Sequence, residues 1–226
     1  STMTEVENQL LFDEGLTAKG KSIIEQNMNL DLKAAYERSM DMAREHTPFS
    51  IDMLNELSSI VMRRTGEVVN APGGVFDSSK GDLRRVNVTA GAMGKSYMSY
   101  LMVPQELDDF CKEMNERRTN LIKEPDVYEQ YRLSFDAHLK LVTIHPWVDG
   151  NGRMSRLMMN YLQTEFGLVP SKVLVEDKAE YIEALVKSRE EDSYLLFQNF
   201  MFKEHAKNLQ QEIDNYKLSL GEEEEK

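Results

Sequence analysis

Apolar side chains recur at the three- and four-residue spacing of amphipathic helices through most of the chain, while glycine, proline and asparagine gather in a few places. This pattern predicts two helices between Leu16 and Met40, and a third after Ser50, a residue type that favours the N-cap position. It predicts further helices over residues 103–115, 125–144, 151–166, 178–187 and 192–209. We therefore expect an all-α fold.

The segment from Gly66 to Val103 departs from helical spacing, because Gly, Pro, Asn and Ser accumulate there. We expect mostly loop, with one short hairpin in which residues 86–88 and 97–100 alternate about a turn at residues 90–94. An isolated hairpin is at best marginally stable in water, so this one should lean on the helical body.

The composition is that of an ordinary soluble protein, since 41% of the 226 residues are hydrophobic and 29% are charged. The formal net charge of −12 disfavours nucleic acid as a partner, because an acidic chain repels a phosphate backbone at long range, although a small anion can still bind locally. Cys111, the single cysteine, suits a reducing compartment, and no apolar run approaches the ~20 residues of a membrane helix. We expect a cytoplasmic protein that binds neither nucleic acid nor a membrane.

The stretch from His145 to Arg156 concentrates reactive side chains between two amphipathic helices. A Gly-Asn-Gly run at residues 150–152 leads into the second helix, whose first amides have no partner within the helix and form an anion site. Arg153 and Arg156 stand three residues apart beside that site. Asp149 offers a hard oxygen ligand for Mg²⁺, and His145 is the nearby residue type that can take a proton from a hydroxyl at neutral pH.

Each of these features has a simpler explanation when it is taken alone. A Gly-Asn-Gly run is most often only a helix start, an isolated histidine is more often structural, and paired arginines on a helix usually face solvent or a surface carboxylate. Their coincidence in one loop favours a polyphosphate site. The two common phosphate motifs, a Gly-rich loop ending in Gly-Lys-Ser/Thr and Gly-x-Gly-x-x-Gly after a strand, are missing from the sequence.

The same stretch resembles the signature of the Fic (Fido) family, His-x-Phe-x-Asp/Glu-Gly-Asn-Gly-Arg-x-x-Arg, and matches every fixed position except Trp147, where Phe is usual. The exchange keeps a large aromatic anchor under the loop. The resemblance implies a helical bundle of about eight helices with a small β-hairpin flap over the active site. We expect an inhibitory N-terminal segment over residues 1–20, a Fic domain over residues 21–217, and an acidic, disordered tail over residues 218–226.

The resemblance further implies an enzyme that transfers AMP from Mg-ATP to a Ser, Thr or Tyr hydroxyl of a target protein. ATP and that protein are then the expected partners, and Mg²⁺ is the expected cofactor. His145 would be the base that deprotonates the hydroxyl, and Asp149 would hold Mg²⁺ against the phosphates. The remaining phosphate ligands would be an anion hole made by Gly150, Asn151 and Gly152, with Arg153 on the α/β region and Arg156 on the γ-phosphate.

The hairpin over residues 86–100 resembles the flap of the family, whose edge receives a target segment as an added strand. Tyr97 and Met98 are the target contacts that we expect there, and simple packing of both side chains is the alternative.

Near the N-terminus, Glu7 followed by Asn8 resembles the inhibitory motif of the family, Ser/Thr-x-x-x-Glu-Gly/Asn, in which the Glu pairs with the second Arg. The Ser/Thr position is Met3 in this chain, and a register two residues earlier places Val6 where Gly or Asn belongs. Glu7 as an ordinary acidic residue at a helix start is the simpler alternative.

Three functions stay open at this stage. The first is AMP transfer, which the resemblance favours. The second is removal of AMP from a modified protein or transfer of another phosphate-containing group. The third is a nucleotide-binding module without turnover, and the presence of His145 argues against this third function. Gly152 argues against the kinase-like Doc variant, in which Lys takes that position. Where many family members have Tyr-x-x-x-Leu-x-x-x-Asn, this chain has Tyr181, Leu185 and Arg189. The choice of base therefore stays open, as do the target and whether the chain forms a homo-oligomer.

Overall fold

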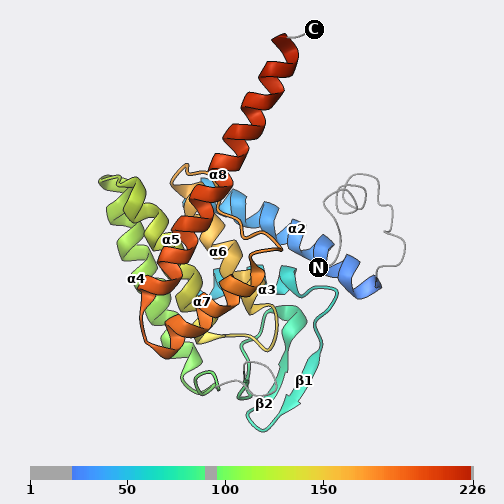
Figure 1. The fold of residues 1–226 in the computed structure, drawn as a ribbon. Helices are drawn as coiled ribbons and strands as arrows, with labels where there is room; N and C mark the ends of the chain where they lie inside the picture. Colours follow the sequence, from blue (N-terminus) through green and yellow to red (C-terminus); the bar gives the residue numbers. More distant parts are fainter. Residues whose placement is uncertain (1–21, 90–95, 225–226) are drawn as a thin grey trace. The chain divides into compact units, whose positions relative to one another are not determined.

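A computed structural model describes residues 22–89 and 96–224, and the chain divides after Leu168 into two units (Figure 1). The first unit contains α2 (Ile23–Arg44), α3 (Ile51–Val61), β1 (Val68–Ala71), β2 (Gly74–Asp77), the 3-10 turn η1 (Ser78–Lys80), α4 (Val103–Lys123), α5 (Val127–Ile144) and α6 (Asn151–Glu165). The second unit contains α7 (Lys178–Glu190) and α8 (Tyr194–Glu224). Helices dominate both units, which confirms the predicted all-α class.

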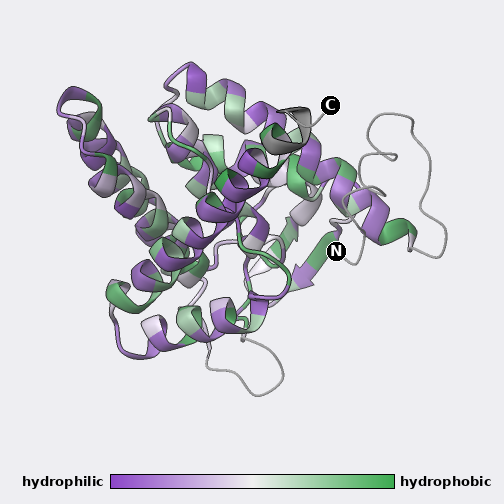
Figure 2. Cartoon of the chain, turned by 45° about the horizontal axis from the view of Figure 1, so that its top comes forward, coloured by the Kyte–Doolittle hydropathy of each residue, from purple (hydrophilic) through white to green (hydrophobic). Residues whose placement is uncertain are grey.

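The core of the first unit is built around the contact between α5 and α6, with α2 and α3 packed on α6 and α4 packed on α5. Hydrophobic positions alternate with hydrophilic ones along these helices (Figure 2), as expected for amphipathic elements that bury one face. The residues that the two central helices bury include Leu133, Ala137, Leu141, Met158 and Leu162. This packing fixes both ends of the loop that joins α5 to α6.

At the start of the first unit the described residues from Ser22 onward form one helix, α2, and residues 16–21, where the two predicted helices would begin, lie outside the described residues. Ser22 caps α2 by accepting a hydrogen bond from the amide of Glu25 at 3.1 Å. The polar residues that interrupt the apolar pattern have partners of their own inside the fold: Asp31 is buried, accepts from the Arg64 amide at 2.8 Å and pairs with the Arg64 guanidinium. Tertiary partners therefore interrupt the apolar stripe without ending the helix.

The first unit contains two strands that the sequence did not predict. The antiparallel sheet of the described residues is β1–β2, which pairs Val68 with Asp77 and Ala71 with Gly74 in a region expected to be loop. Its strands have four residues each, too few for a clear alternation of apolar and polar positions.

At the predicted hairpin, the described residues form one bridge between Thr89 and Ser96, and the Tyr97 amide donates to the Val88 carbonyl at 3.0 Å. These contacts lie where the hairpin was predicted, and its turn, residues 90–95, lies outside the described residues. The Val86 and Met98 carbonyls accept from the Arg84 guanidinium.

The ends of several helices follow the predicted signals. Ser50 caps α3 by accepting from the Met53 amide at 3.1 Å, and Gly167, with a φ of +70°, follows α6.

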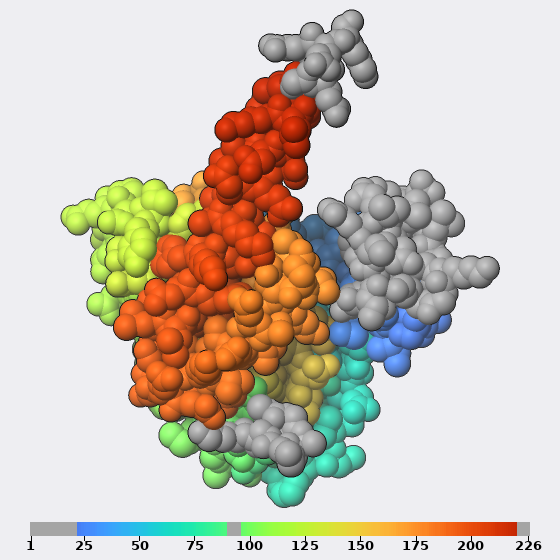
Figure 3. Space-filling model, in the orientation of Figure 1, coloured from blue at the N-terminus to red at the C-terminus, as the bar shows by residue number. Residues whose placement is uncertain are grey.

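In the second unit, α8 continues through residues 218–224, which the sequence assigned to a separate acidic tail, and its later turns extend past α7 (Figure 3). The three domain limits stay a prediction.

No helix in the described ranges combines the length and the apolar character needed to cross a lipid bilayer.

Candidate active site

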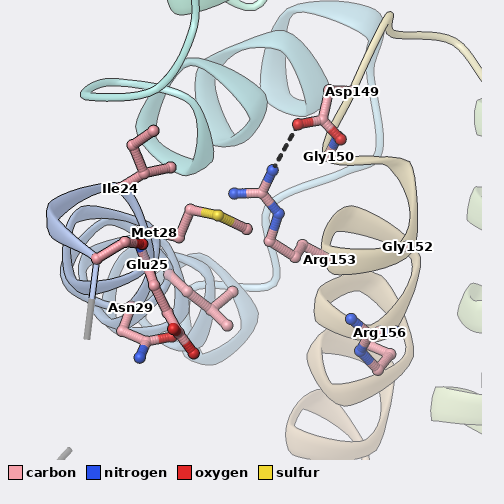
Figure 4. A pocket seen from close by; sticks show the side chains of 11 residues that line it. Ile24, Glu25, Met28, Asn29, Asp149, Gly150, Gly152, Arg153 and Arg156 are labelled. Carbon is pink, nitrogen blue, oxygen red and sulfur yellow. Dashed lines mark hydrogen bonds and ion pairs between the residues drawn. The ribbon is translucent and has the colours of Figure 1, made fainter. Parts of the chain in front are cut away.

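A cavity of about 580 Å³ lies between α2 and the start of α6 (Figure 4). On the α6 side it is lined by Asp149, Gly150, Gly152, Arg153 and Arg156, so the structure brings together five of the predicted phosphate and metal ligands. On the α2 side it is lined by Ser22, Ile24, Glu25, Met28, Asn29 and Leu32, a wall that the sequence did not predict. His145 and Asn151 are not among the lining residues.

The first turn of α6 presents main-chain amides to this cavity. Gly150 precedes the helix with a φ of +80°, a conformation that glycine adopts readily, and its carbonyl accepts the first helical hydrogen bond, from the Met154 amide at 2.9 Å. The amides of residues 151–153 consequently lack the carbonyl acceptor that later amides of the helix find four residues earlier. The N-terminus of α6 therefore offers several donors and a partial positive charge to an anion.

Asn151 and Trp147 hold the loop in place from behind. The Asn151 side chain accepts from the Trp147 amide at 3.1 Å and donates to the Trp147 carbonyl at 2.8 Å. The Trp147 indole is 1% exposed and donates to the Gly81 carbonyl at 3.1 Å, so it is the buried anchor that the sequence predicted. Because the Asn151 side chain is engaged in the loop, an anion can reach this residue through its amide only.

The two arginines of α6 differ in how far they are buried. Arg153 donates to the Val61 carbonyl and to Asp149, both at 3.2 Å, and its side chain is 10% exposed. Burial is the main cause that lowers the pKa of Arg153, the nearby Arg156 cation acts in the same direction, and Asp149 acts against both. Arg156 is exposed and lines the same cavity. Two neighbouring cations beside a helix N-terminus favour an occupant with several negative charges.

Asp149 lies at the rim of the cavity, and its side chain is 68% exposed. One carboxylate oxygen accepts from the Gly150 amide at 2.6 Å and the other pairs with Arg153. The described part of the chain contains no cluster of three or more His, Cys, Asp or Glu that could hold a metal ion. An exposed carboxylate beside a phosphate site is chemically suited to a divalent cation that takes its other oxygen ligands from a bound polyphosphate and water.

His145 ends α5 in the left-handed region, with a φ of 53°. Its ring Nδ1 lies 3.1 Å from the Val142 carbonyl, and because a carbonyl can only accept, Nδ1 carries the proton in the neutral ring. Nε2 is then the nitrogen that can accept a proton. The Tyr97 ring stacks on this imidazole, with ring centroids 3.7 Å apart and planes 20° from parallel.

Other predicted residues are placed as follows. Met98 is half-buried and packs against the core of the first unit. Tyr181 and Leu185 are buried on α7, where Tyr181 packs on Phe197 of α8 with ring centroids 6.1 Å apart. Glu7 lies outside the described residues.

Two buried residues near the site were not predicted to contribute to it from the sequence. Arg84 is buried and contacts the main chain on both sides of the site, yet it stands in a loop without a motif. His138 lies on α5 and is completely buried beside Arg156. Burial, and secondarily the Arg156 cation, lowers the pKa of His138 to about 3, so this ring is neutral at pH 7.

Together these features define a helical protein whose α5–α6 loop carries an anion site at a helix N-terminus and an oriented histidine. Comparison with known families agrees: the sequence model described as the Fic/DOC family matches residues 48–163, and the chain belongs to this family.

Relatives and solved structures extend the similarity. The chain is 29% identical over 187 residues to the protein adenylyltransferase fic-1 of Caenorhabditis elegans, covering 82% of this chain and 33% of that protein. It is 30% identical over 198 residues to the protein adenylyltransferase Fic of Drosophila grimshawi, covering 85% of this chain and 36% of that protein. Among solved structures, Fic-1 of C. elegans superposes with a TM-score of 0.74 at 25% identity, covering 96% of this chain and 60% of that one. The chain thus spans well under half the length of these two curated relatives.

Proposed function

We propose that this protein transfers AMP from ATP to a hydroxyl side chain of a target protein. The observation that carries the proposal is the α5–α6 loop, where one short segment holds an oriented histidine, an anion-binding helix start and two arginines. The names of the two relatives described above, both protein adenylyltransferases, support the same reaction.

In this reaction the target oxygen forms a bond to the α-phosphorus while the bond from that phosphorus to the pyrophosphate oxygen breaks. His145 Nε2 takes the proton of the hydroxyl, because Nδ1 is held by the Val142 carbonyl. The amides of residues 151–153, with Arg153 and Arg156, bind the phosphates and stabilise the charge that develops on the departing pyrophosphate. The chain therefore contributes mainly positioning and charge.

We propose that Asp149 holds Mg²⁺ together with the bound phosphates. The support is its exposed carboxylate at the cavity rim, beside the two arginines. When bound, the ion supplies charge neutralisation at the phosphate oxygens. In the structure the same carboxylate pairs with Arg153, so phosphate binding would release Arg153 from Asp149 for the ligand.

For target binding we propose that an extended segment of the target adds to the flap beside Tyr97 and Met98. Support comes from the place of Tyr97, whose ring covers the base, since a segment bound there would present its hydroxyl next to His145.

We further propose that Glu7 inhibits the enzyme by pairing with Arg156. Its support is that α2, which follows the segment carrying Glu7 in the sequence, begins at the cavity, where Ser22 and Ile24 belong to the lining.

We also propose a cytoplasmic location. The single cysteine is reduced and buried in the core of the first unit, where burial raises the pKa of Cys111 to about 12. Cell fractionation with an antibody to the chain tests the location.

The decisive experiment incubates the chain with Mg-ATP labelled on the α-phosphate, with and without a cell lysate, and follows label on protein. We expect labelled protein with the parent and none with His145→Ala, while ATP affinity stays within about twofold, because the substitution removes the base and no phosphate ligand. Equal labelling by the two proteins would overturn the role of His145. ATP binding without any label, in the parent and in a Glu7→Gly variant, would favour a binding module.

A further inference from the structure

Arg84 is a buried arginine whose three guanidinium nitrogens each donate to a main-chain carbonyl. It is 1% exposed. Nε donates to the His145 carbonyl at 2.7 Å, Nη1 to the Val86 carbonyl at 2.8 Å, and Nη2 to the Met98 carbonyl at 2.7 Å. The Arg84 amide adds a fourth bond, to the Pro146 carbonyl at 3.0 Å.

Such burial is costly for a charged group. Among the residues that the structure describes, no carboxylate forms an ion pair with Arg84, and burial lowers the pKa of its guanidinium. The dipoles of the three main-chain carbonyls, which are fixed in direction, stabilise the charged guanidinium instead. A planar fork with five N–H donors can meet three such carbonyls at once, whereas a lysine ammonium on a flexible stem cannot reproduce that geometry.

The three carbonyls belong to segments that meet at the site. The His145 carbonyl belongs to the proposed base, at the left-handed end of α5. Val86 and Met98 lie on the two legs of the flap, on either side of the bridge between Thr89 and Ser96. Met98 also follows Tyr97, the residue that stacks on the His145 ring. One side chain therefore joins both legs of the flap to the catalytic loop.

We infer that Arg84 is a positioning residue that clamps the flap to the end of α5 and so holds the Tyr97 ring over His145. The importance of this for catalysis rests on the proposed function, because it assumes that His145 is the base. The clamp itself is a geometric claim that can be measured without any AMP transfer.

The first measurement is NMR of the histidine ring protons in the full chain. The chain has four histidines, so the resonance of His145 is assigned by its loss in His145→Asn. Protons that lie over the face of an aromatic ring shift upfield, and we expect this for His145 because of the Tyr97 stack. In Arg84→Lys and Arg84→Gln the resonance should move toward the position of a free histidine.

The matched controls are Arg85→Lys and Arg85→Gln, since Arg85 is the neighbouring arginine and is exposed. They should leave the His145 resonance unchanged. ATP affinity, measured by calorimetry, should be the same in all four variants, because Arg84 and Arg85 are not among the residues lining the phosphate cavity.

The second measurement is the rate of self-labelling from Mg-ATP at saturation. Displacement of the flap should lower this rate by about tenfold or more in Arg84→Lys, with little change in KM for ATP, because sub-ångström alignment controls the rate. If neither the parent nor Glu7→Gly labels, the proposed function fails while the NMR result still tests the clamp.

An unchanged upfield shift in folded Arg84→Lys and Arg84→Gln would overturn the inference, and so would an equal loss of the shift in the Arg85 controls. Failure of both Arg84 variants to fold, with both Arg85 variants folded, would also overturn it, because Arg84 would then support the unit as a whole rather than the flap.

Discussion

The Tyr97 ring lies almost flat on the imidazole of His145, with the ring centroids 3.7 Å apart and the planes 20° from parallel. The hydrogen bond from Nδ1 to the Val142 carbonyl fixes the imidazole at one edge, and the stack fixes the plane of the ring. Two independent contacts therefore orient the proposed base.

Tyr97→Leu should lower the rate of AMP transfer by up to about tenfold, because an aromatic pair of this kind contributes about 0.5–1.5 kcal/mol beyond its buried area. Tyr97→Phe keeps the ring and should retain most of the rate. The measurement is self-labelling at saturating Mg-ATP, with ATP affinity as the control. Equal rates in Tyr97→Leu and the parent would show that the stack does not contribute to catalysis.

The glycines at the start of α6 should respond differently to a methyl group. A Cβ on Gly152 would meet the Arg156 guanidinium at 3.5 Å, an ordinary contact, and would add its volume to the lining of the cavity. We expect Gly152→Ala to fold normally and to weaken ATP binding by about tenfold, since the methyl group occupies space that a phosphate needs next to the amides.

Gly150→Ala is the companion variant. Gly150 has a φ of +80°, and a Cβ there would lie 3.1 Å from the Met62 sulfur. We expect the free energy of unfolding to fall by about 1–3 kcal/mol. Chemical denaturation and calorimetry of both variants separate the two effects; a destabilised Gly152→Ala with unchanged ATP affinity would contradict the assignment of Gly152.

Asp149→Ala should remove most of the difference in ATP affinity between solutions with and without Mg²⁺. The carboxylate is exposed at the cavity rim, and no cluster of three acidic, His or Cys side chains in the described residues could replace it as a metal site. Calorimetric titration with and without Mg²⁺ checks this, and Asp149→Asn tests whether the negative charge is required. The same Mg²⁺ dependence in Asp149→Ala as in the parent would assign the metal to other ligands.

The completely buried His138 should make the protein sensitive to mild acid. Burial lowers the pKa of His138 from 6.5 to about 3, so the unfolded chain binds a proton below pH 6.5 that the folded chain does not bind until about pH 3. This contribution to stability is present above pH 6.5 and is lost as the pH falls through that window. Between pH 7 and pH 5 the loss is about 2 kcal/mol.

Urea unfolding at the two pH values measures this loss. In His138→Gln, which cannot titrate in this range, the decrease in stability between pH 7 and pH 5 should be smaller by about the same 2 kcal/mol. An identical decrease in the parent and in His138→Gln would mean that other groups cause the acid sensitivity.

The sequence predicted the loop of the site better than its surroundings. Residues 145–156 are contiguous, so their residue types could be assigned to one site before the fold was known, and five of them line the cavity. The partners of Arg84 lie 2, 14 and 61 residues away, and no local pattern marks such a set. The α2 wall was missed for a similar reason: its residues lie far from Asp149 in the sequence, and the packing of α2 on α6 brings them to the cavity.

The last prediction concerns Glu7 and depends on competition for Arg156. Arg156 is exposed at the cavity and would bind the γ-phosphate, and a carboxylate docked against the same guanidinium would have to be displaced before the phosphate could bind productively. ATP held with its γ-phosphate elsewhere would present its α-phosphorus poorly for in-line attack. A misalignment of about 1 Å can cost on the order of 100-fold in rate.

Glu7→Gly should therefore raise self-labelling by tens-fold or more at saturating Mg-ATP, without raising the amount of folded protein. Glu5→Gly is the matched control, because it removes a neighbouring carboxylate from the same segment and should leave the rate at the parent level. The double variant Glu7→Gly, Arg156→Ala should lose the gain, since Arg156 is the group that the glutamate is proposed to occupy. If Glu7→Gly labels itself at the parent rate, Glu7 is only an acidic residue near a helix start, and any inhibition of the parent would have to come from another part of the chain.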